Sequence, residues 1–507
     1  MIKDTIRKLS SPDNLRKFFM GPIYPILVAI IVTVGYFSGL ELYFHLFNMA
    51  LAITAMCFCD SLRPIMIQVW TFVFQISREH TPATNNNTGI PSDYYFTEWR
   101  VWVLILSFVA VAVALVYFYV RNKLITAERL RSLPHLIPSL LLAVAFSIGG
   151  VLSADWDAGS LGFGLVQCVM WFVIFYLMLI GFTNEKSEEL IDYLIYIASI
   201  VVIMLTVQLL EIFVTTDVSE MIDPETGGIL RAIVSYGWGN TNTAAQSLTV
   251  TIPIMFLGVM RTKKREYYFV MATVAMVASL LNMSRTAMVV GVPIYIVLLI
   301  VTFIKSTDKR RYLIEILAIV GCIAIGLLLM RQQVAMIIEN YVMRGTGDSG
   351  RYKIWENALI AFREDWLFGK GFFGLAKYFP GWSNTEFIPY MAHNTPVHML
   401  GCCGIYGFIA YIVYRVCTTI PFIKRFDMVK GMLGTALLSV FLGSLFENFV
   451  FYIMPMLSYS VIYAAAYRYI EEKREESEKA PEGNSPYELA ARTDSAADTV
   501  PLAQGQE

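Results

Sequence analysis

Long apolar stretches, separated by short polar segments, recur along most of the chain. Nearly all are long enough to cross a membrane as one helix, which takes roughly 17–25 residues. One shorter stretch, at 64–77, brings the total to about fourteen. The stretches lie at 22–40, 42–59, 64–77, 99–120, 134–152, 161–182, 190–213, 243–260, 267–283, 286–304, 312–330, 394–416, 431–447 and 449–468. The pattern predicts an all-α polytopic membrane protein with about 12–14 transmembrane helices.

The polar segments between these stretches differ in charge in a way that predicts topology. Short basic segments alternate along the chain with other polar segments, and cytoplasmic loops are usually the basic ones. The basic segments are 121–132, 261–266, 305–311 and 424–430, on the side of the basic N-terminus. The opposite side receives 81–93, 154–160, 214–242 and a long loop at 331–392. Both termini are therefore expected in the cytoplasm, and the long loop outside it.

Composition agrees with this interpretation. Of the 507 residues, 56% are hydrophobic and 16% are charged, which is too apolar for a soluble protein of this length. The net charge of −1 gives no indication of a nucleic-acid partner. All seven cysteines fall in or against apolar stretches, so buried thiols are expected rather than disulfides.

The ends of the chain differ from its middle. Residues 1–21 are basic and no small-residue cleavage site follows the first apolar stretch, so they are expected to be a retained cytoplasmic segment. Residues 22–470 form the predicted transmembrane domain. Residues 471–507 are charged and then rich in Ser, Ala and Pro, which is typical of a disordered cytoplasmic tail.

One arginine interrupts the apolar pattern. Arg285 lies in the sequence MSRT, between the stretches 267–283 and 286–304, at a turn predicted to reach the extracytoplasmic face. An arginine at the centre of a membrane helix costs roughly 2.5–3.5 kcal/mol on insertion scales. Arg285 is therefore expected at a surface, where it snorkels, or beside a partner.

Other polar residues are expected on the same face. Arg231 precedes a GNTN turn, Arg351 opens an amphipathic helix in the long loop, and His393 with Asn394 lies where the chain re-enters the membrane. Taken singly, each fits an ordinary loop, surface helix or interfacial residue. Together they combine arginine, which binds phosphate oxygens bidentately, with histidine, which transfers protons near neutral pH. That combination would suit an enzyme acting on a lipid diphosphate.

These segments resemble the O-antigen ligase and O-antigen polymerase superfamily. The similarity runs from about 200 to 410, and the first 200 residues match only as generic membrane helices. Its elements are Arg231 with GNTN, the Ser-Arg pair at Arg285, Arg351 at a helix start, the GxG at 369–371, His393 with Asn394, and Gly404 with Gly407.

The resemblance implies a metal-independent, inverting glycosyltransferase with a GT-C-like fold and no cofactor. Its donor would be a glycan on undecaprenyl diphosphate, and its acceptor a hydroxyl of a glycan or glycolipid at the extracytoplasmic face of a bacterial inner membrane. Arg231, Arg285 and Arg351 would bind the diphosphate. His393 would orient or deprotonate the acceptor, beside Asn394.

Several alternatives remain open at this stage. Ligase and polymerase differ in acceptor, and nothing in the sequence separates them, although Arg363 and Gly374 fit an R-x10-G pattern of polymerases. The DWD at 155–157 resembles the metal-binding Asp-x-Asp of enzymes that use nucleotide sugars. A flippase or transporter would share the helix count, but it would be expected to carry ionisable residues mid-membrane and paired repeats.

Overall fold

The computed structural model describes residues 11–76, 98–216, 241–329, 331–344, 350–379 and 389–479. Within these ranges the chain is built of helices, with no strand. The longer helices are α2 (Pro12–Met20), α3 (Ile23–Ser38), α4 (Glu41–Phe58), α5 (Ile65–Thr71), α7 (Glu98–Arg121), α9 (Leu136–Ile148), α10 (Ala158–Cys168), α11 (Ile174–Gly181), α12 (Ser187–Thr215), α13 (Thr241–Thr249), α14 (Thr251–Arg261), α15 (Arg265–Leu281), α16 (Val292–Lys305), α17 (Lys309–Leu329), α18 (Arg331–Arg344), α19 (Arg351–Glu364), α20 (Thr395–Ile423), α21 (Met428–Gly443) and α22 (Ile453–Lys479).

Each apolar stretch identified in the sequence coincides with a helix or a pair of consecutive helices. Among the described residues, seven helices are long and apolar enough to cross a membrane, or eight if the bent pair α2 and α3 is one span. Several of the others are shorter or are interrupted. The chain is thus an all-α polytopic membrane protein, and the larger number of 12–14 spans stays a prediction.

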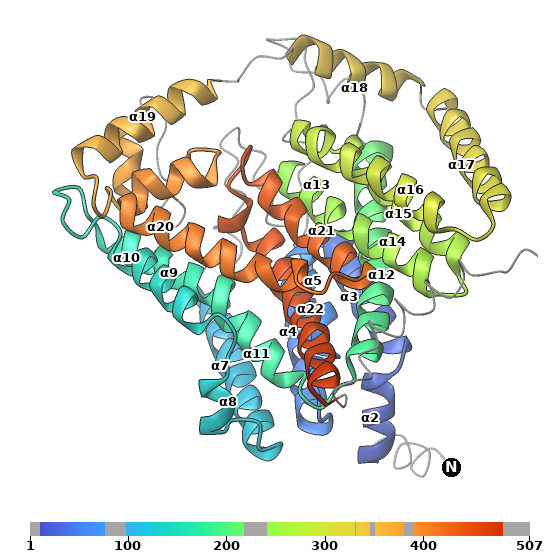
Figure 1. The fold of residues 1–507 in the computed structure, drawn as a ribbon, viewed down its shortest axis with the longest axis horizontal. Helices are drawn as coiled ribbons and strands as arrows, with labels where there is room; N and C mark the ends of the chain where they lie inside the picture. The colour runs from blue at the N-terminus through green and yellow to red at the C-terminus, as the bar shows by residue number, and fades with distance from the viewer. Residues whose placement is uncertain are drawn as a thin grey trace, which may run out of the picture.

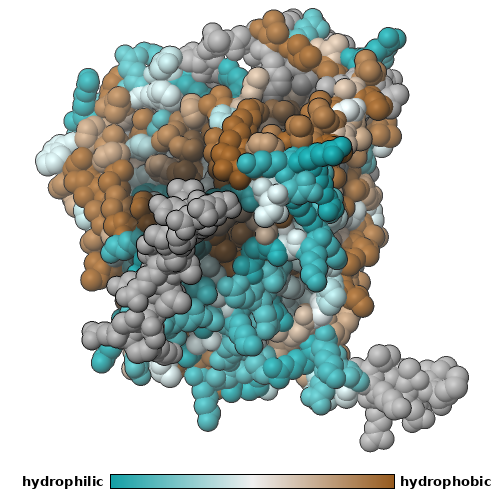
Figure 2. Space-filling view, turned by 45° about the vertical axis from the view of Figure 1, so that its right-hand side comes forward, coloured by the Kyte–Doolittle hydropathy of each residue, from teal (hydrophilic) through white to brown (hydrophobic). Residues whose placement is uncertain are grey.

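Helix α7 shows how the outer surface of the helical domain suits lipid. Only 11% of its most apolar 18-residue segment is buried inside the protein. Large apolar side chains are exposed along it, including Leu106 (65% exposed) and Val120 (70% exposed). Figure 2 shows hydrophobic side chains over much of the upper part of one face, and hydrophilic ones gathered toward its lower middle. Exposed apolar surface of this extent is expected where lipid replaces water.

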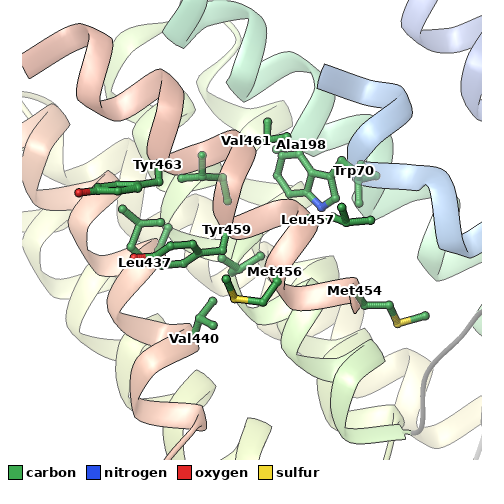
Figure 3. Packing of buried hydrophobic residues seen from close by; sticks show 14 of the residues in the cluster. Trp70, Ala198, Leu437, Val440, Met454, Met456, Leu457, Tyr459, Val461 and Tyr463 are labelled. Atoms are coloured by element: carbon green, nitrogen blue, oxygen red, sulfur yellow. The ribbon is translucent and has the colours of Figure 1, made fainter. Parts of the chain in front are cut away.

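Helix α22 forms the centre of the packed core. It packs against α11, α12, α21 and α5. In Figure 3 its side chains Leu457, Tyr459 and Val461 lie between Leu437 and Val440 of α21 and Trp70 of α5, with Ala198 of α12 beside them. Burial of these apolar groups contributes roughly 25 cal/mol per Å² of apolar surface removed from solvent in water-based scales.

Ion pairs connect segments of the chain at each of two opposite ends of the molecule. At one end Arg63 pairs with Glu185, and Arg261 pairs with Glu188. Arg261 begins a basic segment predicted to be cytoplasmic, and the alternation of the predicted helices would place the connections near Arg63, Glu185 and Glu188 on the same side. At the other end Lys370 pairs with Asp155, as expected of two segments predicted on the opposite side.

The same division is visible in the arrangement of the helices. In Figure 1, α18 and α19 run along the top, whereas α2 and the short α8 (Ala127–Arg131) lie at the bottom. Helices that the charge pattern places on opposite sides therefore lie at opposite ends of the structure.

Candidate active site

A buried carboxylate joins two of the predicted site residues. The Glu447 side chain is 2% exposed, and its Oε2 lies 2.7 Å from Nδ1 of His393. Its Oε1 accepts a hydrogen bond from Arg351 (2.8 Å) and another from Nδ2 of Asn242 (2.7 Å). Three segments far apart in sequence thus meet at Glu447, which lies in the turn between α21 and α22.

His393 is presented by a short, sharply turned segment. Its backbone has a φ of +50°, a left-handed conformation that non-glycine residues adopt rarely and that recurs at functional sites. Asn394 follows as the N-cap of α20, with its Oδ1 accepting from the Val397 N–H (3.1 Å). The amide of Asn394 also donates to the Leu445 carbonyl (2.9 Å), two residues before Glu447. The histidine and its carboxylate partner are therefore fixed relative to each other by the backbone.

Arg351 is the first residue of α19, where the chain turns through Gly350 (φ +77°). The side chain of Arg351 is 20% exposed, so it lies at the edge of the site. One turn along the helix, Trp355 donates from its indole N–H to the carbonyl of Ala392 (2.9 Å). This bond ties α19 to the residue before His393.

The glycines of the matched pattern explain how the outer loop is held against α20. That helix is interrupted at Gly404, whose φ is +64°. Across the interruption, the N–H of Gly371 donates to the Cys402 carbonyl (2.9 Å), and that of Ile405 donates to the Trp366 carbonyl (2.8 Å). A Cβ on Gly404 would lie 2.4 Å from the Leu367 carbonyl oxygen, so only glycine fits there.

Arg285 lies on a neighbouring element. It is partly buried, just before the π-helix η5 (Ala287–Gly291), which packs against α13 and α21. Those two helices carry Asn242 and lead to Glu447 respectively. Arg231 lies outside the described residues, so the structure says nothing about its position.

Tyr390 lies beside the histidine, with the ring centroids 6.1 Å apart. Burial, followed by the charge of Glu447, raises the pKa of Tyr390 to about 12, so the phenol stays protonated at neutral pH.

His398 has a different environment. It is completely buried, lies against the rings of Phe372 and Phe451, and accepts from the Ala392 N–H (3.4 Å). Its contacts are those of a packing residue beneath the His393 segment.

The two aspartates of the DWD have other partners. Asp157 caps α10 by accepting from the N–H groups of Gly159 (2.5 Å) and Ser160 (3.3 Å). Asp155 is ion-paired with Lys377 and Lys370, and the hydrogen bond from Lys377 holds the pKa of Asp155 below its usual value. Among the described residues no group of three or more His, Cys, Asp or Glu side chains is placed to hold a metal ion.

Sequence reasoning missed Glu447 and Asn242. Glu447 lies at the end of an apolar stretch, in the sequence LFENFVF, and Asn242 belongs to the GNTN turn, which by itself fits an ordinary loop before a helix. The available signal was the charge itself, because an ionisable residue inside so apolar a segment needs a partner.

Comparison with known families agrees with the sequence analysis. Residues 270–412 match the family model described as O-antigen ligase. No curated protein matches the chain. The matched segment is less than a third of the chain and contains Arg285, Arg351, His393 and Asn394, whereas Glu447 lies beyond it. The resemblance to the O-antigen ligase superfamily is thereby confirmed, and it supports glycan transfer of the ligase or polymerase type in general.

Proposed function

We propose that the likeness to O-antigen ligase extends to activity: the chain transfers a glycan from an undecaprenyl-diphosphate-linked donor to an acceptor hydroxyl, with inversion and without a metal. The observation that carries the proposal is the pairing of Arg351 with His393 through Glu447. It brings together, at one end of the membrane domain, a guanidinium group that can bind phosphate and an imidazole that can accept a proton.

The reaction needs three changes at the anomeric carbon and the acceptor. His393 takes the proton of the acceptor hydroxyl at Nε2, while the acceptor oxygen bonds to the anomeric carbon from the face opposite the diphosphate. The bond from that carbon to the phosphate oxygen breaks, and its electron pair leaves with undecaprenyl diphosphate. Arg351, Arg285 and Arg231 neutralise the charge that develops there, which stabilises the transition state.

A cavity lined by residues of α12, α15 and α17 supports a lipid-linked donor. It has a volume of about 400 Å³ and is lined by apolar side chains of α12, α15 and α17, among them Leu209, Leu281 and Ile319. It reaches along α15 to Leu281, close in sequence to Arg285. An apolar cavity of this kind suits a polyprenyl chain, whose diphosphate would then meet the arginines.

The site would face the extracytoplasmic side of a bacterial inner membrane, with both termini in the cytoplasm. The ion pairs at the two ends of the molecule support this division, and the Lys and Arg distribution assigns the sides. The partners would be the donor, a glycan or glycolipid acceptor and membrane lipid.

A transfer assay tests the proposal. Purified protein in EDTA is given a labelled glycan on undecaprenyl diphosphate together with candidate acceptors, and products are separated by size. We expect transfer in EDTA, with a single addition for a ligase and a ladder of products for a polymerase. Transfer that needed Mg²⁺ or Mn²⁺ would contradict the metal-independent mechanism, and movement of the donor across vesicles without transfer would favour a flippase.

A further inference from the structure

The Glu447 carboxylate is bonded to several residues of the candidate site. It is almost fully buried, yet it accepts hydrogen bonds from side chains on three other segments. A buried carboxylate is costly unless it is paired and hydrogen-bonded, so these donors account for its stability. They also fix the direction in which each of its oxygens points.

The distance of 2.7 Å between Oε2 and Nδ1 of His393 determines where the imidazole carries its proton. An ionised carboxylate can only accept, so Nδ1 must be the protonated nitrogen. In the neutral ring, Nε2 then has a lone pair available to accept. Within the part of the chain that the structure describes, no group hydrogen-bonds to Nε2.

We propose that Glu447 is a positioning residue for transfer: it holds His393 in the tautomer whose Nε2 accepts the acceptor proton, and it stabilises the imidazolium that forms. This inference rests on the proposed function and adds to it the group that orients the base. By accepting from Arg351 at its other oxygen, Glu447 also sets the distance between the base and the phosphate-binding arginine.

Replacement of Glu447 with glutamine is expected to change the tautomer of His393. In Glu447→Gln the amide oxygen remains opposite Arg351 and Asn242, because both of these are donors there. The amide NH₂ then faces Nδ1, which must become the acceptor. The proton moves to Nε2, and the ring can no longer accept from the acceptor hydroxyl.

The expected result is a fall in kcat of roughly 100- to 10,000-fold, the range of a general base. Glu447→Asp should restore part of kcat because it keeps a carboxylate. Glu185→Gln is the matched control: Glu185 is also a buried carboxylate paired with an arginine, Arg63 at 3.0 Å, but at the opposite end of the molecule. It should lower stability without lowering the kcat of the folded fraction.

A double-mutant cycle separates positioning from a structural role. In a His393→Ala background, Glu447→Gln should change kcat within about twofold, because the group through which Glu447 acts is gone. The same large loss in both backgrounds would overturn the inference, as would near wild-type kcat in Glu447→Gln. If the wild-type protein transferred no glycan, the proposed function itself would fail; if it transferred and the cycle were additive, only the role of Glu447 would fail.

Discussion

Arg285, the residue that breaks the apolar pattern, lies next to elements that pack around the candidate site. It stands before η5, which packs on the helices that carry or lead to Asn242 and Glu447. The sequence predicted the arginines and the His-Asn pair because charges are conspicuous in apolar segments. It could not predict Glu447 as the partner of Arg351 and His393, since that partnership depends on how α21 and α22 are placed against α19 and α20.

The proposed role of Arg285 in binding the diphosphate can be tested by replacing it. Arg285→Ala should weaken donor binding and transfer together, because a hydrogen bond to a charged group contributes roughly 1.5–3 kcal/mol. Arg285→Lys should recover only part of the donor binding and transfer rate, since lysine cannot donate two parallel hydrogen bonds to a phosphate as the planar guanidinium does. Both are measured by donor binding and transfer rate in purified protein. Lys353→Ala, which removes an exposed cation on α19 (70% exposed), is the control and should match the wild type; unchanged donor binding in Arg285→Ala would contradict the assignment.

His398 illustrates a residue whose role only the fold could settle. In the sequence it lies a little over one turn beyond His393 and outside the motif elements of the resemblance, which suggests that it tolerates replacement. The structure buries it completely under the segment that carries His393. Alanine there is therefore expected to reduce the yield of folded protein, and it is not a neutral comparison for His393.

At the scale of elements, periodicity and length predicted the helices well. The apolar stretches coincide with helices, and the start of α20 at Asn394 was anticipated from the sequence. The interruption of α20 at Gly404 was not, because a Gly inside an apolar stretch is compatible with a continuous helix. The need for glycine comes from the neighbouring loop segment around Leu367, a contact distant in sequence.

This interruption leads to a stability prediction. Gly404→Ala should destabilise the protein by more than about 1 kcal/mol, because the new Cβ meets the Leu367 carbonyl and the φ is left-handed. Gly321→Ala, on α17 with nothing within 4 Å of the new Cβ, should be neutral or slightly stabilising. Thermal unfolding in detergent compares the two variants. Equal melting temperatures would show that the interruption does not need glycine.

At the scale of the whole molecule, the charge pattern predicted which segments gather at each end. Ion pairs such as that between Arg261 and Glu188 connect segments of one predicted side. The assignment of the ends to the cytoplasm and the exterior depends on the positive-inside rule, which concerns insertion and leaves no trace in helix packing.

Labelling of single cysteines tests that assignment. In a background without the native cysteines, Lys353→Cys on α19 should react with an impermeant maleimide from outside, whereas Lys186→Cys should react only after the membrane is opened. Both side chains are well exposed, at 70% and 80% respectively, so access is not limited by burial. The reverse pattern would place the site on the cytoplasmic side and remove the basis for an extracytoplasmic glycan donor.

The most direct test of the account compares donor binding with transfer in wild-type protein and His393→Ala. Binding of the undecaprenyl-diphosphate-linked glycan and its single-turnover transfer are measured side by side in EDTA. If His393 is the base, donor affinity changes little and the rate falls roughly 100- to 10,000-fold. Transfer by His393→Ala at near the wild-type rate would contradict the mechanism.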